Sequence, residues 1–320
     1  MKIEGNKFLV TGGAGFIGSH LVDMLLEKGA EKVVIFDNFI RGGSYNLTNA
    51  LRNEKAELFK VKGDTTHMDE LDEAVKGVEG VFHLAALSLA HCQEYPRASL
   101  DVNVVGTFNL LDACVKHNVE RVMFASSSSI YGNAIYSPMD EEHLWGNRNF
   151  YGATKIAGEA LIRAFHFKYD LEYLAYRFMN VYGPRQDYLG VYIAVIIKII
   201  DRLHQNLSPI IFGDGSQGFD FVFVKDVCRS LVLGMESSLS DESYNISSGK
   251  QTTVLELCKT IIKLMGKKDI PIEFKELNDN TLVNNRIGST EKAKKELEFE
   301  VDTSLEEGLR QVIEWKLSQN

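Results

Sequence analysis

Residues 7–18 read KFLVTGGAGFIG, and this stretch decides the fold class. Lys7 to Thr11 form a short apolar run that is typical of a buried parallel strand. The glycines that follow allow a tight turn, and the apolar spacing from Phe16 to Lys28 predicts a helix that ends at Gly29. Strand, glycine loop and helix in this order predict the first unit of a parallel α/β sheet.

The glycine loop carries a phosphate-binding spacing. Gly13, Gly15 and Gly18 match G-x-G-x-x-G, and Gly12 starts a second match, G-x-x-G-x-x-G, that shares the last two glycines. Glycines at these positions let a pyrophosphate approach the backbone, where the N–H groups of the helix N-terminus can bind it. Asp37 closes the next predicted strand, residues 32–37, at the separation of about 20 residues that the dinucleotide fingerprint requires.

The acid at the strand end bears on the choice of dinucleotide. A carboxylate at Asp37 would accept hydrogen bonds from ribose hydroxyls and repel a 2′-phosphate, which favours NAD over NADP. Arg41 follows four residues later, and because an arginine can bind a 2′-phosphate, NADP stays an alternative cofactor. A glycine turn with a surface aspartate is the competing interpretation. Asp64, after the third predicted strand, is expected either to reach the adenine or to lie solvated in a loop.

The remaining apolar pattern extends the same architecture. Strands are predicted at residues 57–62, 80–84, 121–126 and 172–178, and helices at 68–75, 101–118 and 151–169. This alternation predicts an α/β fold, a doubly wound parallel (Rossmann) sheet, with a smaller mixed α/β substrate-binding domain after Asn180. We expect a dinucleotide-binding domain of residues 1–179 and 221–250, and a substrate domain of residues 180–220 and 251–320.

Composition excludes several other classes of protein. The 320 residues carry a formal net charge of −9, which disfavours nucleic-acid binding. The chain has 4 cysteines, which form no C-x-x-C pair, so neither a metal site nor a disulfide framework is expected. The most apolar later stretch, residues 192–200, is too short to cross a bilayer, and the first strand leaves no room for a signal peptide. We therefore expect a soluble, cytoplasmic protein with no membrane partner.

Tyr151 and Lys155 lie one helical turn apart on a predicted helix. A nearby ammonium favours the phenolate, so the lysine is expected to lower the pKa of the tyrosine and make it a general base. Such a pair can arise by chance in a chain with 12 tyrosines. The pair is informative because of its position. It lies downstream of Ser127, which ends the fifth predicted strand, and ligands bind at that edge of the sheet.

The serine run from Ser126 to Ser129 ends the same strand. Hydroxyl groups there suit a site that binds hydroxylated substrates, whereas a plain polar turn is the alternative. Asn103 is expected either to brace this site through its amide or to lie on a helix surface.

At these residues the chain resembles the extended short-chain dehydrogenase/reductase family, in particular its nucleotide-sugar epimerase and dehydratase branch. The resemblance runs nearly from end to end. It is carried by residues 11–18, 37–38, 63–64, 83–86, 103, 126–127, 131–132, 151–155, 177–185, 212–217 and 304–309.

The resemblance implies roles for single residues. Tyr151 would be the base, Lys155 would hold the nicotinamide ribose, and Ser127 would hydrogen-bond the reacting sugar hydroxyl. It also implies dimerisation through helices at residues 101–118 and 151–169. The implied NAD contacts are Gly12, Gly15, Phe16, Ile17, Gly18, Asp37, Asn38, Asp64, Leu84, Ala85, Ala86, Asn103, Tyr151 and Lys155.

The residues after Ser127 narrow the reaction that the resemblance implies. Dehydratases and decarboxylases of the family carry an Asp or Glu there, and epimerase/reductases a Cys, whereas this chain has Ser128 and Ser129. The remaining chemistry is 4-epimerisation of a nucleotide-sugar, most readily a UDP-sugar, through a 4-keto intermediate. A dehydrogenase or 4-keto reductase on the same scaffold and a non-catalytic NAD-binding protein are the alternatives.

The substrate pocket departs from the family pattern. Phe219 stands where relatives often carry a diphosphate-binding arginine, and Asp279 stands where they carry a second one. Arg286 falls at or near the position that gates the sugar pocket. It is expected to bind the diphosphate, to recognise a carboxylate on the sugar, or to be a surface arginine. The expected substrate contacts are Ser127, Ser128, Asn180, Arg185, Phe219 and Arg286.

Overall fold

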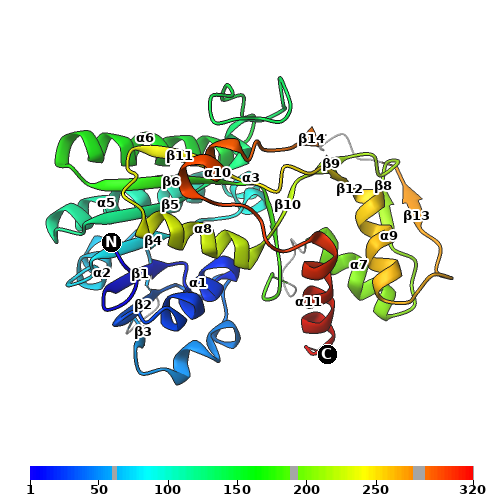
Figure 1. The fold of residues 1–320 in the computed structure, drawn as a ribbon, viewed down its shortest axis with the longest axis horizontal. Coiled ribbons are helices and arrows are strands. Elements are labelled where there is room, and N and C mark those ends of the chain that lie inside the picture. Colours follow the sequence, from blue (N-terminus) through cyan, green and yellow to red (C-terminus); the bar gives the residue numbers. More distant parts are fainter. Residues whose placement is uncertain (60–62, 188–193, 277–284, 320) are drawn as a thin grey trace.

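The computed structural model describes residues 1–59, 63–187, 194–276 and 285–319. Its centre is a seven-stranded sheet in the order β3-β2-β1-β4-β5-β6-β11, in which every neighbouring pair is parallel (Figure 1). The predicted doubly wound sheet is confirmed. The strands are β1 (Lys7–Thr11), β2 (Lys32–Phe36), β3 (Ala56–Leu58), β4 (Gly80–His83), β5 (Arg121–Ser127), β6 (Glu172–Phe178) and β11 (Glu242–Ile246).

Helices cover both faces of this sheet because alternate strand residues are apolar on each side. In β1, Phe8 and Val10 pack with one set of helices, α1 (Phe16–Glu27) and α8 (Val224–Glu236). Leu9 packs on the opposite face with α2, α5 and α6. The helices of this part are completed by α2 (Met68–Ala74), α3 (Leu89–Glu94), α4 (Pro96–Leu100), η3 (Asp101–Val105), α5 (Gly106–Lys116) and α6 (Phe150–Tyr169). Short 3₁₀ turns are η1 (Ser44–Leu47), η2 (Ala50–Arg52) and η4 (Ser128–Ile130).

The helix predicted at residues 101–118 is present as an unbroken helical stretch from Asp101 to Lys116, but its first turn differs in type. Its first turn, η3, is a π-helix, and α5 begins only at Gly106. Such one-turn π segments are frequent at functional sites because they rotate the side chains that follow. The predicted third strand is also shorter than expected, since β3 ends at Leu58 and residues 60–62 lie outside the described part of the chain.

The second half of the chain forms a smaller body beside the sheet, on the right of Figure 1. Parallel strands β7 and β10 connect it to the sheet. Within the described ranges, no helix is both long and apolar enough to cross a membrane. The proposed domain boundaries stay a prediction. The elements of this body are β7 (Asn180–Tyr182), α7 (Val195–His204), β8 (Ile210–Phe212), β9 (Gly218–Phe219), β10 (Phe221–Phe223), β12 (Thr252–Thr253), α9 (Val254–Leu264), β13 (Glu273–Lys275), β14 (Asn285–Arg286) and α11 (Leu305–Leu317). Helix α10 (Glu291–Leu297) instead lies against β11 and α8 of the large sheet (Figure 1).

Candidate active site

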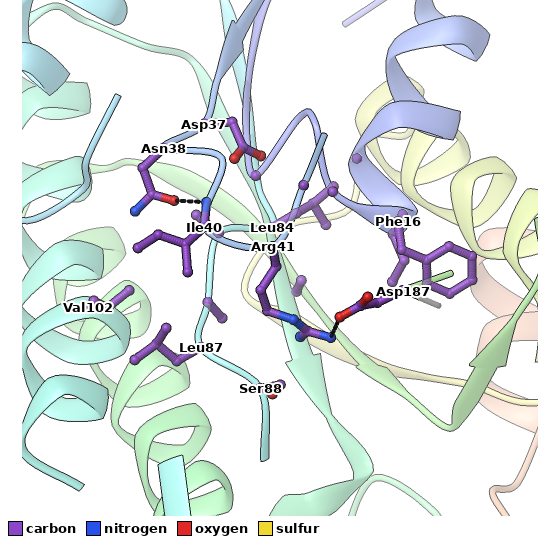
Figure 2. A pocket seen from close by; sticks show the side chains of 18 of the residues that line it. Phe16, Asp37, Asn38, Ile40, Arg41, Leu84, Leu87, Ser88, Val102 and Asp187 are labelled. Carbon is purple, nitrogen blue, oxygen red and sulfur yellow. Dashed lines mark hydrogen bonds and ion pairs between the residues drawn. The ribbon is translucent and has the colours of Figure 1, made fainter. Parts of the chain in front are cut away.

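A cavity of about 320 Å³ opens at the carboxyl ends of β1, β2 and β4 (Figure 2). This is the edge of an open parallel sheet at which ligands bind. Of the predicted NAD contacts, all but Asp64 and Asn103 line it. The lining consists of Gly12, Gly15–Gly18, Phe36–Asn38, Ile40–Gly42, Tyr45, Asn46, Gly63, Thr65, Leu84–Ser88, Val102, Ala125, Ser126, Tyr151, Lys155, Phe178 and Arg185–Asp187.

The glycine loop has no room for side chains. Gly12 has a φ of +71°, and a Cβ there would lie 2.8 Å from the Ala85 nitrogen. A Cβ on Gly18 would lie 2.1 Å from the Gly12 oxygen. Helix α1 starts at Phe16, and no side chain caps its first N–H groups. The loop therefore forms a cradle of backbone that fits the pyrophosphate of NAD.

Asp37 lies at the end of β2, with its carboxylate facing this cradle (Figure 2). Its oxygens accept hydrogen bonds from the backbone N–H groups of Ala14 (2.9 Å) and Phe39 (2.8 Å). Burial raises the pKa of Asp37, and these hydrogen bonds act in the opposite direction. A carboxylate has about four acceptor sites and the backbone N–H groups of Phe39, Ala14 and Gly15 use three of them, so Asp37 can still accept a ribose hydroxyl.

Two loops, of which only Asn38 and Arg185 were expected at the site from the sequence, also form the cavity wall with residues 40–42, 45–46 and 186–187. One follows β2 and the other follows β7. Arg41 on the first lies 3.6 Å from Asp187 on the second, measured from Nη2 to Oδ2, across the opening (Figure 2). The arginine that left NADP open is thus paired with an aspartate. The sequence feature that could have indicated the approach of the first loop to the glycine cradle is Gly42. A Cβ at this position would lie 2.6 Å from the Ala14 carbonyl carbon, so a larger residue would not fit.

Asp64 does not line the cavity but supports a residue that does. Its carboxylate accepts a hydrogen bond from Asn38 Nδ2 (3.3 Å) and two from Thr66. These hydrogen bonds lower the pKa of Asp64, although burial acts against them. The aspartate therefore orients Asn38 at the cavity wall.

Asn103, on the π-helix η3, is buried and braces the site. Its Oδ1 accepts from the Leu87 N–H (2.7 Å), and its Nδ2 donates to Thr154 Oγ1 (3.1 Å). Thr154 in turn donates to the Tyr151 carbonyl (2.8 Å). The amide thus joins the loop after β4 to the first turn of α6, as the bracing interpretation expects.

The tyrosine, lysine and serine of the predicted catalytic set come together where α6 meets β5. Asn149 caps α6 by accepting a hydrogen bond from the Gly152 N–H (2.7 Å). A Cβ on Gly152 would lie 2.6 Å from the Ser129 oxygen, so only glycine lets the helix start pack this closely on the serine turn. This contact brings the phenol of Tyr151 near enough to the hydroxyl of Ser127 for the two groups to interact.

The charge state of this set differs from the sequence-based expectation. Desolvation raises the pKa of Tyr151 to about 12, and the interaction with Ser127 and the charge of Arg41 lower it less. Lys155 Nζ donates to the Ala125 carbonyl (2.6 Å) and lies 5.7 Å from the Tyr151 ring centre. Burial lowers its own pKa to about 8. In this structure desolvation outweighs the neighbouring charges, so the pKa of Tyr151 lies above its usual value and not below it, and the role of Tyr151 as the base stays a prediction.

The expected substrate residues are spread more widely. Arg185 lines the cavity and pairs with Asp23 (2.7 Å), and its buried Nη1 has no hydrogen-bond partner. Asn180 and Phe219 do not line this cavity. Asn180 Nδ2 lies 3.4 Å from the Asp220 carbonyl, and Asp279 lies outside the described residues.

Ser128 and Arg286 meet behind the catalytic serine. Arg286 Nη1 lies 3.5 Å from Ser128 Oγ, and Nη2 lies 3.5 Å from the Gly132 oxygen. Arg286 is 9% exposed, so the surface-arginine interpretation is wrong. Strand β14 carries Arg286 beside β9, which carries Phe219.

Comparison with known proteins agrees with this geometry. Residues 8–247 match the model of the NAD dependent epimerase/dehydratase family. A solved UDP-N-acetylglucosamine 4-epimerase from Methanobrevibacter ruminantium M1, in complex with UDP-N-acetylmuramic acid, superposes with a TM-score of 0.93. It is 33% identical and covers 99% of this chain and 100% of that one.

Two relatives found by sequence carry different activities. A UDP-glucose 4-epimerase of Mycolicibacterium smegmatis is 34% identical, over 96% of this chain and 97% of its own length. UDP-glucuronic acid decarboxylase 1 of Arabidopsis thaliana is 32% identical, over 96% of this chain and 69% of its own length.

Proposed function

The chain belongs to the NAD-dependent epimerase/dehydratase family, and we propose that it is a nucleotide-sugar 4-epimerase acting through a transient 4-keto sugar. The observation that carries the proposal is the proximity of Tyr151 to Ser127, beside a turn in which Ser128 and Ser129 offer hydroxyl groups and neither a carboxylate nor a thiol. Ser128 and Ser129 have no acid or thiol with which to eliminate water or to protonate carbon. Removal and return of hydride at one carbon is the chemistry that remains.

NAD would be held by the glycine cradle, by Asp37 and Asn38 at the end of β2, and by Lys155. Bound there, NAD would supply the acceptor for the sugar's hydride and the donor for its return, with no net consumption of the cofactor. The fit of the backbone to a pyrophosphate, described above, supports this assignment.

The proton of the reacting hydroxyl is handled by the protein. Ser127 hydrogen-bonds the C4 hydroxyl, and Tyr151 takes its proton and later returns it. Because desolvation holds the pKa of Tyr151 at about 12, the phenolate needs positive charge nearby. Lys155, whose ammonium lies 5.7 Å from the phenol ring, supplies part of that charge.

The sugar must turn over while its nucleotide stays anchored, so that hydride returns to the opposite face. Asn180, Arg185 and Phe219 are proposed contacts for the nucleotide-sugar. We propose that the nucleotide of the substrate is uridine diphosphate, since the relatives described above are named for UDP-sugars.

The test is an incubation of purified protein with a panel of UDP-sugars and no added NAD, followed by proton NMR of the sugar. We expect a C4 epimer to accumulate to equilibrium with no change in nicotinamide absorbance. Loss of CO₂ or water from the sugar would contradict the proposal. A keto product with stoichiometric NADH would instead identify a dehydrogenase, and binding without turnover would identify a non-catalytic NAD-binding protein.

A further inference from the structure

Arg286 is a buried cation that has no carboxylate partner among the residues that the structure describes. Within the described part of the chain its guanidinium has only two long contacts, at 3.5 Å, with a hydroxyl and a carbonyl. Its Nε is buried and has no hydrogen-bond partner. Burial lowers the pKa of Arg286 to about 10, and no nearby anion opposes that shift.

Another buried arginine of the chain, Arg177, shows how a buried guanidinium is usually paired with a carboxylate. Arg177 is 5% exposed and donates to both carboxylate oxygens of Glu159, at 2.8 and 3.1 Å. The pair raises the pKa of Arg177 despite burial. Buried charges are normally paired in this way because desolvation is costly. An anion brought by a ligand would supply the partner that the described residues do not provide.

The position of Arg286 decides which part of a substrate it would meet. Its Nη1 is 3.5 Å from Ser128 Oγ, and Ser128 directly follows Ser127. The sugar must reach Ser127 and Tyr151 with its reacting carbon, and the guanidinium lies beside the residue that follows the sugar-binding serine. Arg185, whose Nη1 also lacks a partner, lies at the cofactor cavity and is the better candidate for the diphosphate.

We propose that Arg286, with Ser128, selects nucleotide-sugars whose sugar carries a carboxylate. A planar guanidinium and a carboxylate form two parallel hydrogen bonds, which would satisfy the orphaned donors. A neutral sugar would leave the cation unpaired. This inference rests on the proposed nucleotide-sugar function but concerns binding, which can be measured without turnover.

The test is titration calorimetry of NAD-loaded protein with matched ligands. UDP-glucuronic acid is compared with UDP-glucose, and UDP-N-acetylmuramic acid, which carries its carboxylate on a lactyl group at C3, with UDP-N-acetylglucosamine. We expect at least one acid to bind about 30-fold or more tightly than its neutral counterpart, and the pair that discriminates locates the carboxylate. Arg286→Gln should abolish this difference, and Arg286→Lys should restore part of it.

The controls separate the possible failures. Arg52→Gln, at an exposed arginine on η2, should leave every affinity unchanged. Unchanged melting temperature and NAD content would show that Arg286→Gln is folded. Equal affinities for acids and neutral sugars in the wild type, or an equal loss for all four ligands in Arg286→Gln, would overturn the inference. If discrimination is found but NMR detects no epimer, the inference stands and the proposed function fails.

Discussion

Tyr151 is a phenol that this chain keeps protonated. Desolvation holds its pKa at about 12, and Lys155 has its own pKa lowered to about 8 while it donates to Ala125. Two groups that burial pushes toward their neutral forms lie on neighbouring turns of α6. Formation of the Tyr151 phenolate therefore depends on positive charge nearby, part of which the Lys155 ammonium supplies.

Tyr151→Phe tests the residue that moves the proton. It removes the hydroxyl and keeps the ring, so we expect kcat to fall by about 10²–10⁴-fold, with cofactor content and melting temperature unchanged. Turnover is measured by NMR of the sugar protons. Tyr169→Phe, at the exposed end of α6, is the control and should leave kcat unchanged. Full turnover by Tyr151→Phe would remove this residue from the mechanism.

The roles of single residues could be predicted from the sequence where the backbone conformation or the charge pattern allows few residue types. The glycines of the first loop and Asp37 were found because tight turns and strand-end acids are local features. The raised pKa of Tyr151 was not, because it depends on how much protein surrounds the phenol. The pairing of Arg41 with Asp187 joins loops far apart in the chain, and no local signal marks the aspartate.

At the scale of elements, the two loops that meet over the cavity are the most informative feature. The Arg41–Asp187 pair is partly exposed and long, at 3.6 Å, so it is worth only about 0.2–1 kcal/mol. It nevertheless spans the mouth through which a cofactor would leave (Figure 2).

Asp187→Asn should speed the loss of bound NAD by about two- to fivefold, and added salt should shrink the difference. Nicotinamide fluorescence of protein loaded with NADH and diluted into buffer measures this rate. Glu306→Gln removes an ion pair with Arg310 that lies on α11, away from the cavity, and should leave the rate unchanged. Equal rates for wild type and Asp187→Asn would mean that the pair does not retain the cofactor.

His20 connects α1 to the loop after β7, since its Nε2 lies 2.9 Å from the Pro184 carbonyl. Burial lowers its pKa to about 4, whereas the unfolded chain titrates near 6.5. The unfolded state therefore binds an extra proton below pH 6.5. The free energy of unfolding should fall as pH drops from about 6.5 to about 4, by up to about 1.4 kcal/mol per pH unit for this residue.

Chemical denaturation across that pH range measures the effect, and His20→Gln should flatten the acid limb. His67 is the control with the opposite sign. A hydrogen bond with Glu70 raises its pKa, so its stabilising contribution is present below pH 6.5 and lost as pH rises through the folded-state pKa. Identical pH profiles for wild type and His20→Gln would contradict this assignment.

For the whole molecule, the sheet was predictable and the second body was not. The central strands were found from buried apolar runs with helices between them, as in β1 and β6. The seventh strand, β11, reads ESYNI and lacks such a run, although a return of the chain to the sheet near residues 221–248 was expected. Strands β9, β12 and β14 each have two residues, and their pairing depends on contacts distant in sequence.

We predict a homodimer formed through the helices of residues 101–118 and 151–169. Val105 and Phe108 on this surface are 48% and 44% exposed, so a substitution there should spare the fold of one protomer. Light scattering over a concentration series should find a dimer in the wild type and a monomer in Val105→Asp. Leu207→Asp, at an exposed leucine after α7, should remain dimeric. A wild-type monomer at all concentrations would refute the prediction.

The central claim is that one carbon of the sugar loses hydride and regains it inside the same site. The most direct measurement starts from a substrate, found in the NMR panel, that carries deuterium at C4. The account predicts that the epimer keeps the deuterium at C4, with none lost to water and none found on free nicotinamide. Deuterium in the solvent, or in released NADH, would contradict it.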